Sequence, residues 1–599
     1  MNKIELIRKI KSLNGITPKE RAYLINLVNA KKKYGLVWED KPEDMEEQLR
    51  EQLPVLKEVK GKAIVNGEGF PNHILIEGDN LHALTALSFT HAGKIDVIYI
   101  DPPYNTGNKD FRYNDSFVDK EDSYRHSKWL SFMHKRLEIA KRLLSKTGVI
   151  FISIDDYEQA ALKLLCDEVF QEINFVGNVI WERAYAPINL KKTISQNHDF
   201  ILIYCRKDFN LLEFNKLPRS EAATSIYKNL DNDPRGLWQS DNFSVGPVIE
   251  EKLYEIRTPA GRIVVPPNGR CWLLTKERYE EFLKDNRIWF GKNGNGVPRI
   301  KRFLSEVREG VVAMSLWKYI EVGHTQDAKR ELKDVLHENK NPFETVKPLK
   351  LLNRILKLVT KPEKGSIILD FFAGSGTTLH ATMQLNAEDG GKRQCILVTN
   401  NENNICEEVT YERNKRVIQG YTNANGEQVK GLIQNSLRYF KTEFVPSMRS
   451  EQNRRLLTEV STDLLCIKED CYHEFTKGYG FNSKQCRLFT NQQGKYLVIV
   501  YYGRKQIEVC EQLIQVIYAL EDLSEPIKLY AFSPEKETLA EEFVEVADRI
   551  DPIPLPDAIY NAFRSTIRTL KLDKKQIASK TNGQASALGE TTLFNQLQA

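Results

Sequence analysis

An apolar run that stops at an acid and two prolines sets narrow limits on how this chain can fold. Residues 95–100 read Ile-Asp-Val-Ile-Tyr-Ile, and Asp101, Pro102, Pro103 and Tyr104 follow. Such a β-branched run predicts a buried parallel strand. Because proline cannot continue a central strand, the chain must leave the sheet at Pro102. Asp101 and Tyr104 are therefore expected at the carboxyl end of a strand, where open α/β sheets bind ligands.

The residues after this strand suit methyl transfer to the exocyclic amine of a nucleobase. That nitrogen is a poor nucleophile because its lone pair is delocalised into the ring. If the Asp101 carboxylate and the Pro102 carbonyl accept its hydrogens, the lone pair becomes localised, and the stiff Pro102-Pro103 geometry holds that carbonyl in place. Tyr104 offers a ring on which a flipped base can stack. The plainer alternative is a turn with a solvated Asp101 and a packed Tyr104.

A glycine loop follows a second apolar strand in the C-terminal half. Residues 365–369 predict the strand and residues 377–385 predict a helix. The candidate ligand loop consists of Asp370, Phe371, Ala373, Gly374, Ser375, Gly376, Thr377 and Thr378. Its glycines let the backbone approach a ligand closely, and its amides point at that ligand. The Gly-Lys-Ser/Thr of a phosphate-binding P-loop is missing, whereas a dinucleotide fold remains open on this loop alone.

Acids at two other predicted strand ends face the same crevice. Residues 74–77 predict a strand that turns at Gly78 into Asp79 and Asn80, and residues 395–400 predict one that runs into Glu402. A carboxylate at such a strand end can bind a ribose hydroxyl. The alternatives are a helix N-cap at Asp79 or Asn80 and a first-turn helix acid at Glu402.

Helices alternate with strands on both sides of an irregular segment. This alternation predicts an α/β fold with right-handed crossovers and a mostly parallel sheet. Between about 208 and 340, scattered Pro, Gly, Asn and aromatic residues predict an insertion of short strands and loops. Its cations fit either contact with nucleic-acid phosphates or a solvated basic face, and they are Arg287, Lys292, Arg299, Lys301 and Arg302.

The composition predicts a cytoplasmic protein whose affinity for nucleic acid is local. The net charge is only +5 over 599 residues, so any DNA-binding surface must be confined to a patch. We find no apolar run of transmembrane length and no secretory signal, and we expect no membrane association. The nine cysteines lie mostly in apolar segments, which predicts reduced thiols. We expect no metal, because the zinc candidates lack paired Cys-x-x-Cys spacing; they are Cys466, Cys471, His473 and Cys486.

The motif Asp101-Pro102-Pro103-Tyr104, continued by residues 105–107 (Asn-Thr-Gly), resembles the catalytic motif of amino-group DNA methyltransferases. This motif precedes the glycine loop, and an insertion separates the two. Such an order is similar to that of the β-class of these enzymes. Residues 371–376, Phe-Phe-Ala-Gly-Ser-Gly, match the family loop as well. The chain is most similar to the modification subunits of type III restriction-modification systems, and the resemblance covers about residues 20–440.

The resemblance implies a Rossmann-like, circularly permuted methyltransferase fold and the cofactor S-adenosylmethionine. Residues 370–378 would bind the cofactor and Glu402 its ribose. Asp79 and Asn80 would line its crevice, and Lys347-Pro348 would start a helix packed on it. The implied reaction is site-specific methylation of N6 on an adenine flipped out of double-stranded DNA. The implied partners are a second copy of the chain and a helicase-nuclease restriction subunit. Cytosine N4 methylation and a non-catalytic DNA-binding subunit are the alternatives.

Together these patterns divide the chain into consecutive segments. We expect an N-terminal helical segment at 1–60, the catalytic half of the methyltransferase domain at 61–207 and an inserted target-recognition region at 208–340. We then expect the cofactor-binding half at 341–440, a smaller C-terminal α/β domain for dimer or partner contact at 441–571, and a flexible tail at 572–599. Within the cofactor-binding half, residues from about 405 to 440 predict a basic, helical closing segment.

Overall fold

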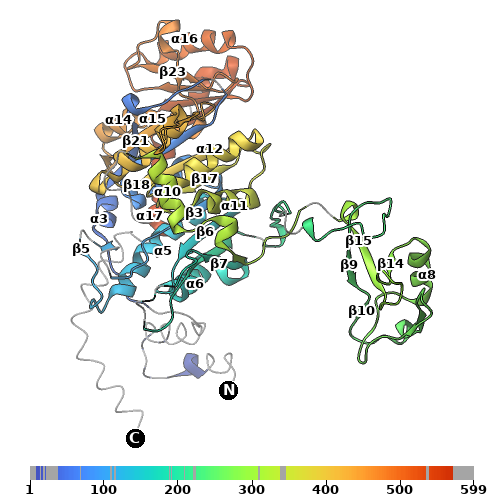
Figure 1. Cartoon of the computed structure of the whole chain (residues 1–599). Coiled ribbons are helices and arrows are strands. Elements are labelled where there is room, and N and C mark those ends of the chain that lie inside the picture. The colour runs from blue at the N-terminus through green and yellow to red at the C-terminus, as the bar shows by residue number, and fades with distance from the viewer. Residues whose placement is uncertain are drawn as a thin grey trace. The chain divides into compact units, whose positions relative to one another are not determined.

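The computed structural model describes residues 9–13, 15, 17, 21, 38–67, 69–107, 111–113, 116–187, 189, 192–207, 209–219, 224–307, 310–337, 346–533 and 539–570. The chain divides into a larger unit, Met1–Glu213 with Met314–Ala599, and a smaller unit, Phe214–Ala313 (Figure 1). The predicted tail at 572–599 and most of residues 1–37 lie outside the described ranges.

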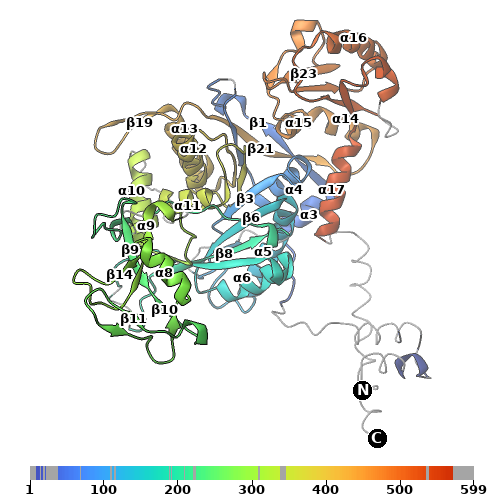
Figure 2. The same ribbon diagram turned by 90° about the vertical axis from the view of Figure 1, so that its right-hand side faces the viewer.

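A ten-stranded mixed sheet is the framework of the larger unit (Figures 1 and 2). Its neighbours from β21 to β6 all run parallel, whereas β1 and β8 run antiparallel to theirs. The predicted α/β architecture with a mostly parallel sheet is thereby confirmed. In spatial order the strands are β1 (Gln52–Glu58), β21 (Ser436–Pro446), β2 (Asn72–Glu77), β18 (Gln394–Thr399), β17 (Ile367–Asp370), β3 (Ile95–Ile100), β6 (Leu144–Ile154), β8 (His198–Cys205), β7 (Phe175–Glu182) and β16 (Leu316–Trp317).

The two halves of the sequence meet at the centre of this sheet. β3 comes from the N-terminal half and β17 from the C-terminal half, yet they are direct neighbours, with Ile98 opposite Leu369. Both strands read as continuous apolar runs because both faces of the sheet are covered. Since the two strands are parallel, Asp101 and Asp370 lie at the same edge of the sheet.

Helices connect and cover these strands (Figure 2). α11 follows Pro348 and buries Leu351, Leu352, Ile355, Leu356 and Leu358, a spacing that puts one apolar face on the core. No helix in the described ranges is long and apolar enough to cross a membrane. The helices are α3 (Asp44–Glu51), α4 (Asn80–Thr90), α5 (Arg125–Leu143), α6 (Gln159–Cys166), α9 (Tyr319–Val322), α10 (Thr325–Val335), α11 (Leu349–Val359), α12 (Thr377–Asp389) and α13 (Glu412–Gln419).

The C-terminal segment forms a second sheet that shares a core with the first. One face packs on α16 (Gln506–Ala519). On the other side, α15 (Thr462–Glu469) and α17 (Asp557–Thr569) contact α4, where the hydroxyls of Ser88 and Thr566 lie 2.8 Å apart. The preceding helix is α14 (Glu451–Val460). The strand order is β22 (His473–Glu474), β23 (Cys486–Thr490), β24 (Tyr496–Val500), β25 (Ile527–Phe532) and β26 (Ile550–Leu555).

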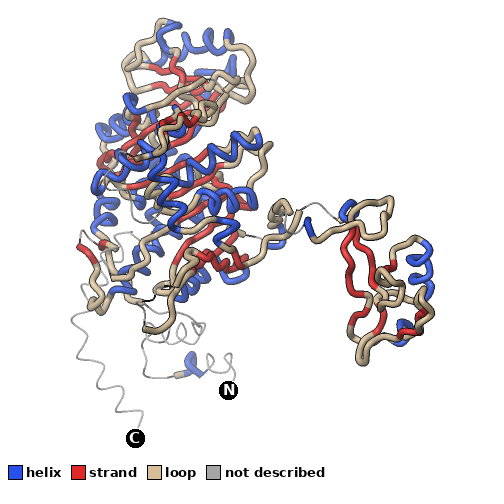
Figure 3. The backbone as a smooth tube through the Cα atoms, viewed as in Figure 1, coloured by secondary structure: helices blue, strands red, loops and turns tan. Residues whose placement is uncertain are grey.

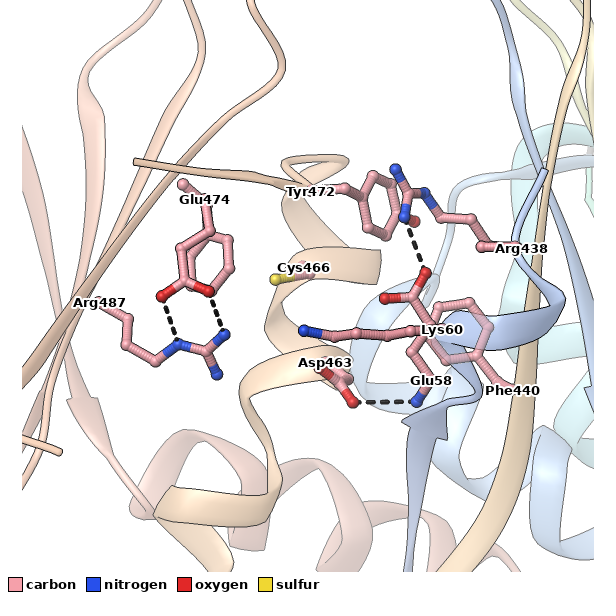
Figure 4. A pocket seen from close by; sticks show the side chains of 11 residues that line it. Glu58, Lys60, Arg438, Phe440, Asp463, Cys466, Tyr472, Glu474 and Arg487 are labelled. Atoms are coloured by element: carbon pink, nitrogen blue, oxygen red, sulfur yellow. Dashed lines mark hydrogen bonds and ion pairs between the residues drawn. The ribbon is translucent and has the colours of Figure 1, made fainter. Parts of the chain in front are cut away.

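Ion pairs line a cavity where the two sheets meet (Figure 4). Arg438 of β21 donates to Glu58 of β1 at 2.7 Å. Arg487 of β23 makes paired hydrogen bonds with Glu474 at 3.0 and 2.6 Å. The Asp463 carboxylate accepts the Glu58 amide at 2.9 Å, and burial raises the pKa of Asp463. Of these contacts, the bond between Asp463 of α15 and the Glu58 amide joins the C-terminal segment to β1. β21 itself runs through the predicted boundary at 440.

The smaller unit consists mainly of short strands and loops, together with the helix α8 (Lys276–Lys284) (Figure 3). It has its own apolar core, which includes Phe243, Trp272 and Ile300. The insertion was expected to reach residue 340, but β16, α9 and α10 belong to the larger unit, where β16 pairs with β7. The elements of the smaller unit are β9 (Trp238–Asn242), β10 (Ser244–Val245), β11 (Ile256–Arg257), β12 (Ile263–Val264), β13 (Cys271–Trp272), α8 (Lys276–Lys284), β14 (Ile288–Trp289) and β15 (Arg299–Phe303).

Two stretches differ from the predicted helical structure. Gln52–Glu58 forms β1, because its apolar residues are buried against β21, a partner distant in sequence. Helix was also predicted through about residue 440, but α13 ends at Gln419, and Gly420 follows with φ +92°. A hairpin of β19 (Tyr421–Thr422) and β20 (Gln428–Val429) then leads into β21. In both stretches, long-range strand pairing overrides the local helical pattern.

Candidate active site

The predicted site residues gather at the carboxyl edge of the central sheet. β2, β18, β17 and β3 are parallel neighbours, so the residues that follow them share this edge. A cavity there is lined by residues of both sequence halves, including Asp101, Lys347, Asp370, Phe372, Ser375 and Thr378. The structure thus brings together the two motifs that the insertion separates in the sequence.

Asp101 is held by two hydrogen-bond donors. The Tyr104 hydroxyl donates to Oδ1 at 2.8 Å, and the Lys347 ammonium group donates to Oδ2 at 2.5 Å. Lys347 Nζ also lies 3.0 Å from the Tyr104 hydroxyl. Burial and the nearby Asp101 carboxylate raise the pKa of Tyr104, so the phenol stays protonated and donates. The three side chains form one closed hydrogen-bonded cluster at the end of β3.

Lys347 contacts a partner that the sequence did not predict. We expected it beside the cofactor, but its ammonium group is paired with Asp101, and only 9% of its side chain is exposed. It lies 5.3 Å from the Tyr104 ring and 5.8 Å from the Trp181 ring. The nearby Asp199 is ion-paired with Arg183 at 2.9 Å, and burial raises the pKa of Asp199. A single lysine before a proline carries no local signal of such a contact.

The backbone of the Asp101–Tyr104 motif is fixed by side chains that the sequence reading missed. The Trp129 indole, on α5, donates to the Pro103 carbonyl at 2.7 Å. The buried Asn105 has φ +56° and donates from Nδ2 to Glu158 at 2.6 Å. Both contacts involve side chains from elements that follow the motif in sequence, and no spacing pattern in the sequence predicts them.

Asp370 organises the glycine loop. Its carboxylate accepts the Thr378 hydroxyl at 2.6 Å and the Phe372 amide at 3.0 Å. Burial raises the pKa of Asp370 to about 7, although these two hydrogen bonds act in the opposite direction. Gly374 (φ +46°) and Gly376 (φ +72°) lie in the left-handed region that favours glycine. The loop enters α12 directly after Gly376, as the sequence predicts.

Residues from the segment before and within α13 hold the glycine loop from outside. The Thr410 hydroxyl donates to the Gly374 carbonyl at 2.5 Å. The buried Arg413 donates to the Thr377 hydroxyl at 2.7 Å, and Asn414 donates to the Gly376 carbonyl at 3.3 Å. The sequence suggested only a basic helical segment here.

Asp79 and Asn80 combine a structural role with a place at the site edge. Asp79 is the N-cap of α4 and accepts the Leu81 amide at 2.7 Å, which is the alternative weighed from the sequence. Asn80 donates to the Phe371 carbonyl at 3.1 Å and accepts from Arg136 at 2.5 Å. Asn80 therefore links the end of β2 to the glycine loop.

Glu402 lies just after β18, at the same edge of the sheet. Its carboxylate is ion-paired with Arg112 of β4 (Arg112–Tyr113), which pairs with β5 (Ser116–Phe117). The Arg112 guanidinium also lies 4.2 Å from the Phe117 ring. A carboxylate and a cation thus stand together where the sequence predicts ribose contact.

Among the predicted DNA-contacting cations, the prediction for Lys301 is wrong. It is buried and ion-paired with Asp231 and Asp233, because its strand, β15, turns that side chain into the unit. Arg287 is paired with Glu306 at 2.6 and 2.5 Å. The three remaining cations are Lys292, which is exposed, Arg302, which is exposed and 3.3 Å from Asp241, and Arg299, which is half-buried and 3.0 Å from the Ser240 hydroxyl.

The structure offers no clustered metal ligands in its described part. No group of three or more His, Cys, Asp or Glu side chains there is arranged to hold a metal ion. None of the nine cysteines forms a disulfide, and all of them are buried, including the zinc candidates Cys466, Cys471 and Cys486. Burial raises the pKa of Cys471 to about 12, which leaves its thiol protonated and chemically inert.

Comparison with known proteins adds independent information. Residues 95–419 match a family model described as DNA methylase. The type III restriction-modification enzyme StyLTI Mod subunit of Salmonella typhimurium is 36% identical over 351 residues, which cover 55% of this chain and 52% of that protein. The type II methyltransferase M.KpnI of Klebsiella pneumoniae is 33% identical over 370 residues, 58% of this chain and 84% of that protein. The type III enzyme EcoP15I Mod subunit of Escherichia coli is 29% identical over 387 residues, 54% of this chain and 58% of that protein.

The matches cover different shares of this chain and of the related proteins. The chain spans about half the length of the StyLTI Mod subunit, but most of M.KpnI. The family match runs from β3 to the end of α13 and so includes Asp101, Tyr104, Lys347 and the glycine loop. This chain belongs to the DNA methylase family.

Proposed function

We propose that this chain transfers a methyl group from S-adenosylmethionine to N6 of an adenine flipped out of duplex DNA. One observation carries the proposal: Asp101 and Lys347, which are hydrogen-bonded to each other and to Tyr104, line the same cavity as the glycine loop of residues 370–378. A base held at the first group and a cofactor held at the second would meet there. The match to a family described as DNA methylase and the relative named as a type II methyltransferase support the same reaction class.

Asp101 would activate the amine by accepting one of its hydrogens. In the structure both carboxylate oxygens are engaged, one by Lys347 and one by Tyr104. An incoming amine would therefore replace one of these donors, and the other would keep Asp101 oriented. The Pro102 carbonyl is the second acceptor in this scheme, and the bond from Trp129 to Pro103 fixes the backbone beside it. With both hydrogens engaged, the nitrogen lone pair points away from the ring plane and becomes nucleophilic.

Tyr104 would supply the surface on which the flipped base stacks. Its hydroxyl is anchored on Asp101, which limits rotation of the ring. A base on that ring would place its exocyclic amine close to the carboxylate that the hydroxyl contacts. The ring of Tyr104 therefore couples base stacking to amine recognition.

The residues present fit S-adenosylmethionine. When bound, this cofactor supplies an activated methyl group on a sulfonium centre. The glycine loop presents its backbone at the cavity, and Asp370 becomes ionised near neutral pH, which suits a cationic ligand. Glu402 lies at the end of β18 and Asp79 at the end of β2, where a carboxylate can accept ribose or amine hydrogens.

We further propose that the chain is the cytoplasmic modification and recognition subunit of a type III system. Three relatives carry type III Mod subunit names, and they support this assignment. The smaller unit would read the DNA, with Arg299, Arg302 and Lys292 available to phosphates. A second copy of the chain and a helicase-nuclease subunit are the proposed partners.

The direct test compares DNA from cells that express the wild-type chain with DNA from cells that express Asp101→Ala. Single-molecule sequencing should detect N6-methyladenine at one short motif in the first sample only. Asp101→Ala should still bind S-adenosylmethionine, because its backbone and the glycine loop are unchanged. N4-methylcytosine would replace the adenine assignment, and equal methylation by both proteins would remove Asp101 from the mechanism.

The proposed DNA surface has its own test. Arg299→Ala combined with Arg302→Ala should weaken duplex binding and reduce the slope of log affinity against log salt by about one to two units. Titration of a fluorescent duplex at several salt concentrations measures both quantities. An unchanged affinity and slope would place the DNA contacts elsewhere.

A further inference from the structure

A buried acid–amide contact lies directly behind the Asp101–Tyr104 motif. Asn105 follows Tyr104, is fully buried and has φ +56°, a backbone conformation that Asn tolerates better than most residues. Its Nδ2 donates to Glu158 Oε1 at 2.6 Å. Glu158 is the residue before α6, and its side chain has no exposed surface.

His126 and Arg125 also lie at this contact. His126 Nδ1 lies 2.6 Å from Glu158 Oε1, and Arg125 Nη2 lies 3.2 Å from His126 Nε2. Both contacts leave Glu158 Oε2 without a donor.

Two acceptor atoms in this contact have no donor. Glu158 Oε2 and Asn105 Oδ1 are both buried, and neither has a hydrogen-bond partner in the described part of the structure. They belong to the same two side chains that already share the bond from Nδ2 to Oε1. One proton placed on Oε2 would serve both atoms, because a protonated carboxyl donates and an amide oxygen accepts. An ionised carboxylate would instead leave two buried acceptors unsatisfied, which is costly.

We propose that Glu158 is protonated at Oε2 and donates this proton to Asn105 Oδ1, closing a cyclic acid–amide pair that positions the Asp101–Tyr104 loop. The role in positioning rests on the proposed methyl transfer, whereas the protonation of Glu158 does not. Burial raises the pKa of Glu158, whereas the bond from Asn105, the charge and the bond of His126, and the nearby Arg125 act in the opposite direction.

The pair makes the loop sensitive to rising pH. When Glu158 loses its proton to solvent, the donor to Asn105 Oδ1 disappears and two acceptors face each other. Asn105 then keeps only the bonds of its Nδ2, to Glu158 Oε1 at 2.6 Å and to the Arg125 carbonyl at 3.4 Å, and the adjacent Tyr104 is less rigidly supported. We therefore expect wild-type methylation to fall as pH rises through the pKa of Glu158, on top of any other titration.

The first experiment compares E158Q with E158A in the full-length protein. The glutamine amide of E158Q can donate to Asn105 Oδ1 and still accept from Asn105 and His126, so its turnover should stay within about threefold of wild type. E158A loses every bond, and its turnover should fall about tenfold or more. E158Q should also lose the decline with rising pH, because an amide does not titrate. The exposed Glu172→Gln is the matched control and should keep the wild-type pH profile.

Two further measurements do not depend on methylation. Infrared difference spectra between wild type and E158Q at neutral pH should contain the carbonyl band of a protonated carboxylic acid. The thermal midpoint of wild type relative to E158Q should fall as pH rises, because a raised carboxyl pKa contributes stability that is lost as pH rises through it. Absence of that band, or an E158Q as impaired as E158A, would show that Glu158 is ionised and would overturn the pair. If the wild-type chain proves unable to methylate DNA, these two readouts still decide the protonation of Glu158.

Discussion

Asp101 has to be ionised to accept a hydrogen from an amine, and Lys347 is the cation that touches it. Replacing Lys347 by Met keeps the length of the side chain and removes the charge. We expect turnover to fall about tenfold or more, because the carboxylate then loses one of the two donors that orient it. Steady-state kinetics with a cognate duplex measure this loss.

The exposed Lys350→Met, three residues further along the same segment, is the control for Lys347→Met and should retain wild-type turnover. The affinity for S-adenosylmethionine separates two roles for Lys347. A fall in cofactor affinity with unchanged turnover would restore the cofactor role that the sequence suggested, in place of the contact with Asp101.

Asp370 links cofactor binding to pH. Its pKa of about 7 means that the carboxyl is mostly neutral at lower pH and ionised at higher pH. A cationic ligand favours the ionised form, so affinity for S-adenosylmethionine should be about tenfold higher at about pH 8 than at about pH 6. Equilibrium dialysis at the two pH values checks this. Asp370→Asn should bind more weakly and with little pH dependence, and a steep dependence in that variant would assign the titration to another group.

The turn into α12 depends on the missing side chain at position 376. A Cβ on Gly376 would lie 2.4 Å from Asn414 Nδ2 and 3.1 Å from Thr410, at φ +72°. Gly376→Ala should therefore cost about 2 kcal/mol or more of unfolding free energy and weaken cofactor binding. Gly390, just after α12, has φ +71°, but no atom lies within 4 Å of the position that a Cβ would take there. Gly390→Ala should cost only about 1 kcal/mol, and equal losses in urea unfolding would contradict the steric argument.

On β15, neighbouring cations have opposite surroundings. Lys301 is buried between Asp231 and Asp233, whereas Arg302 is exposed. Lys301→Met leaves two acids without their cation and should destabilise the smaller unit by about 3 kcal/mol. Arg302→Met should change its stability by no more than about 0.5 kcal/mol. Limited proteolysis of the 214–313 region reports both, and a Lys301→Met protein as resistant as wild type would show that the pairs contribute nothing.

The sequence predicted those elements whose signals are local. The apolar run before Asp101 and the apolar run before the glycine loop each predict a strand that ends at the motif. The structure places both strand ends at the same edge of the central sheet. β1 was missed because its reason to be a strand is β21, which lies far away in sequence. The contact between Lys347 and Asp101 was missed for the same reason, since charge pairs across a fold leave no periodic pattern. The exposure of Lys301 was predicted wrongly because side chains alternate between the two faces of β15. The direction of the Lys301 side chain therefore depends on its position in the strand and not on its charge.

Across the whole molecule, buried neutral histidines tie distant segments together and make the protein acid-sensitive. His73 accepts the Cys395 amide at Nδ1 and contacts Asn435 at Nε2, which joins β2 to β18 and to the start of β21. Burial lowers the pKa of His73 to about 4. The unfolded chain takes up the proton first, so stability is complete above about pH 6.5 and falls as pH drops toward 4, by about 3 kcal/mol for this residue.

Urea unfolding at about pH 7.5 and about pH 5 tests this dependence. His73→Gln can keep both hydrogen bonds without titrating, so its unfolding free energy should change less between the two pH values. His91, whose pKa burial lowers to about 3, should still contribute in that variant. An identical pH dependence in wild type and His73→Gln would exclude His73 as a source of the acid sensitivity.

The strand order has a consequence for how the protein is made. β2 and β3 are synthesised close together, yet β18 and β17 must be inserted between them. On the ribosome, the N-terminal strands therefore emerge long before the pair that fills the space between them, and their backbone edges remain open until residue 399 has left the tunnel. A fragment that stops before Gln394 would contain the whole Asp101 motif and no complete sheet to hold it. A chain whose translation ends early should thus remain unfolded and be bound by chaperones or degraded by proteases, and it should not be a partly active enzyme.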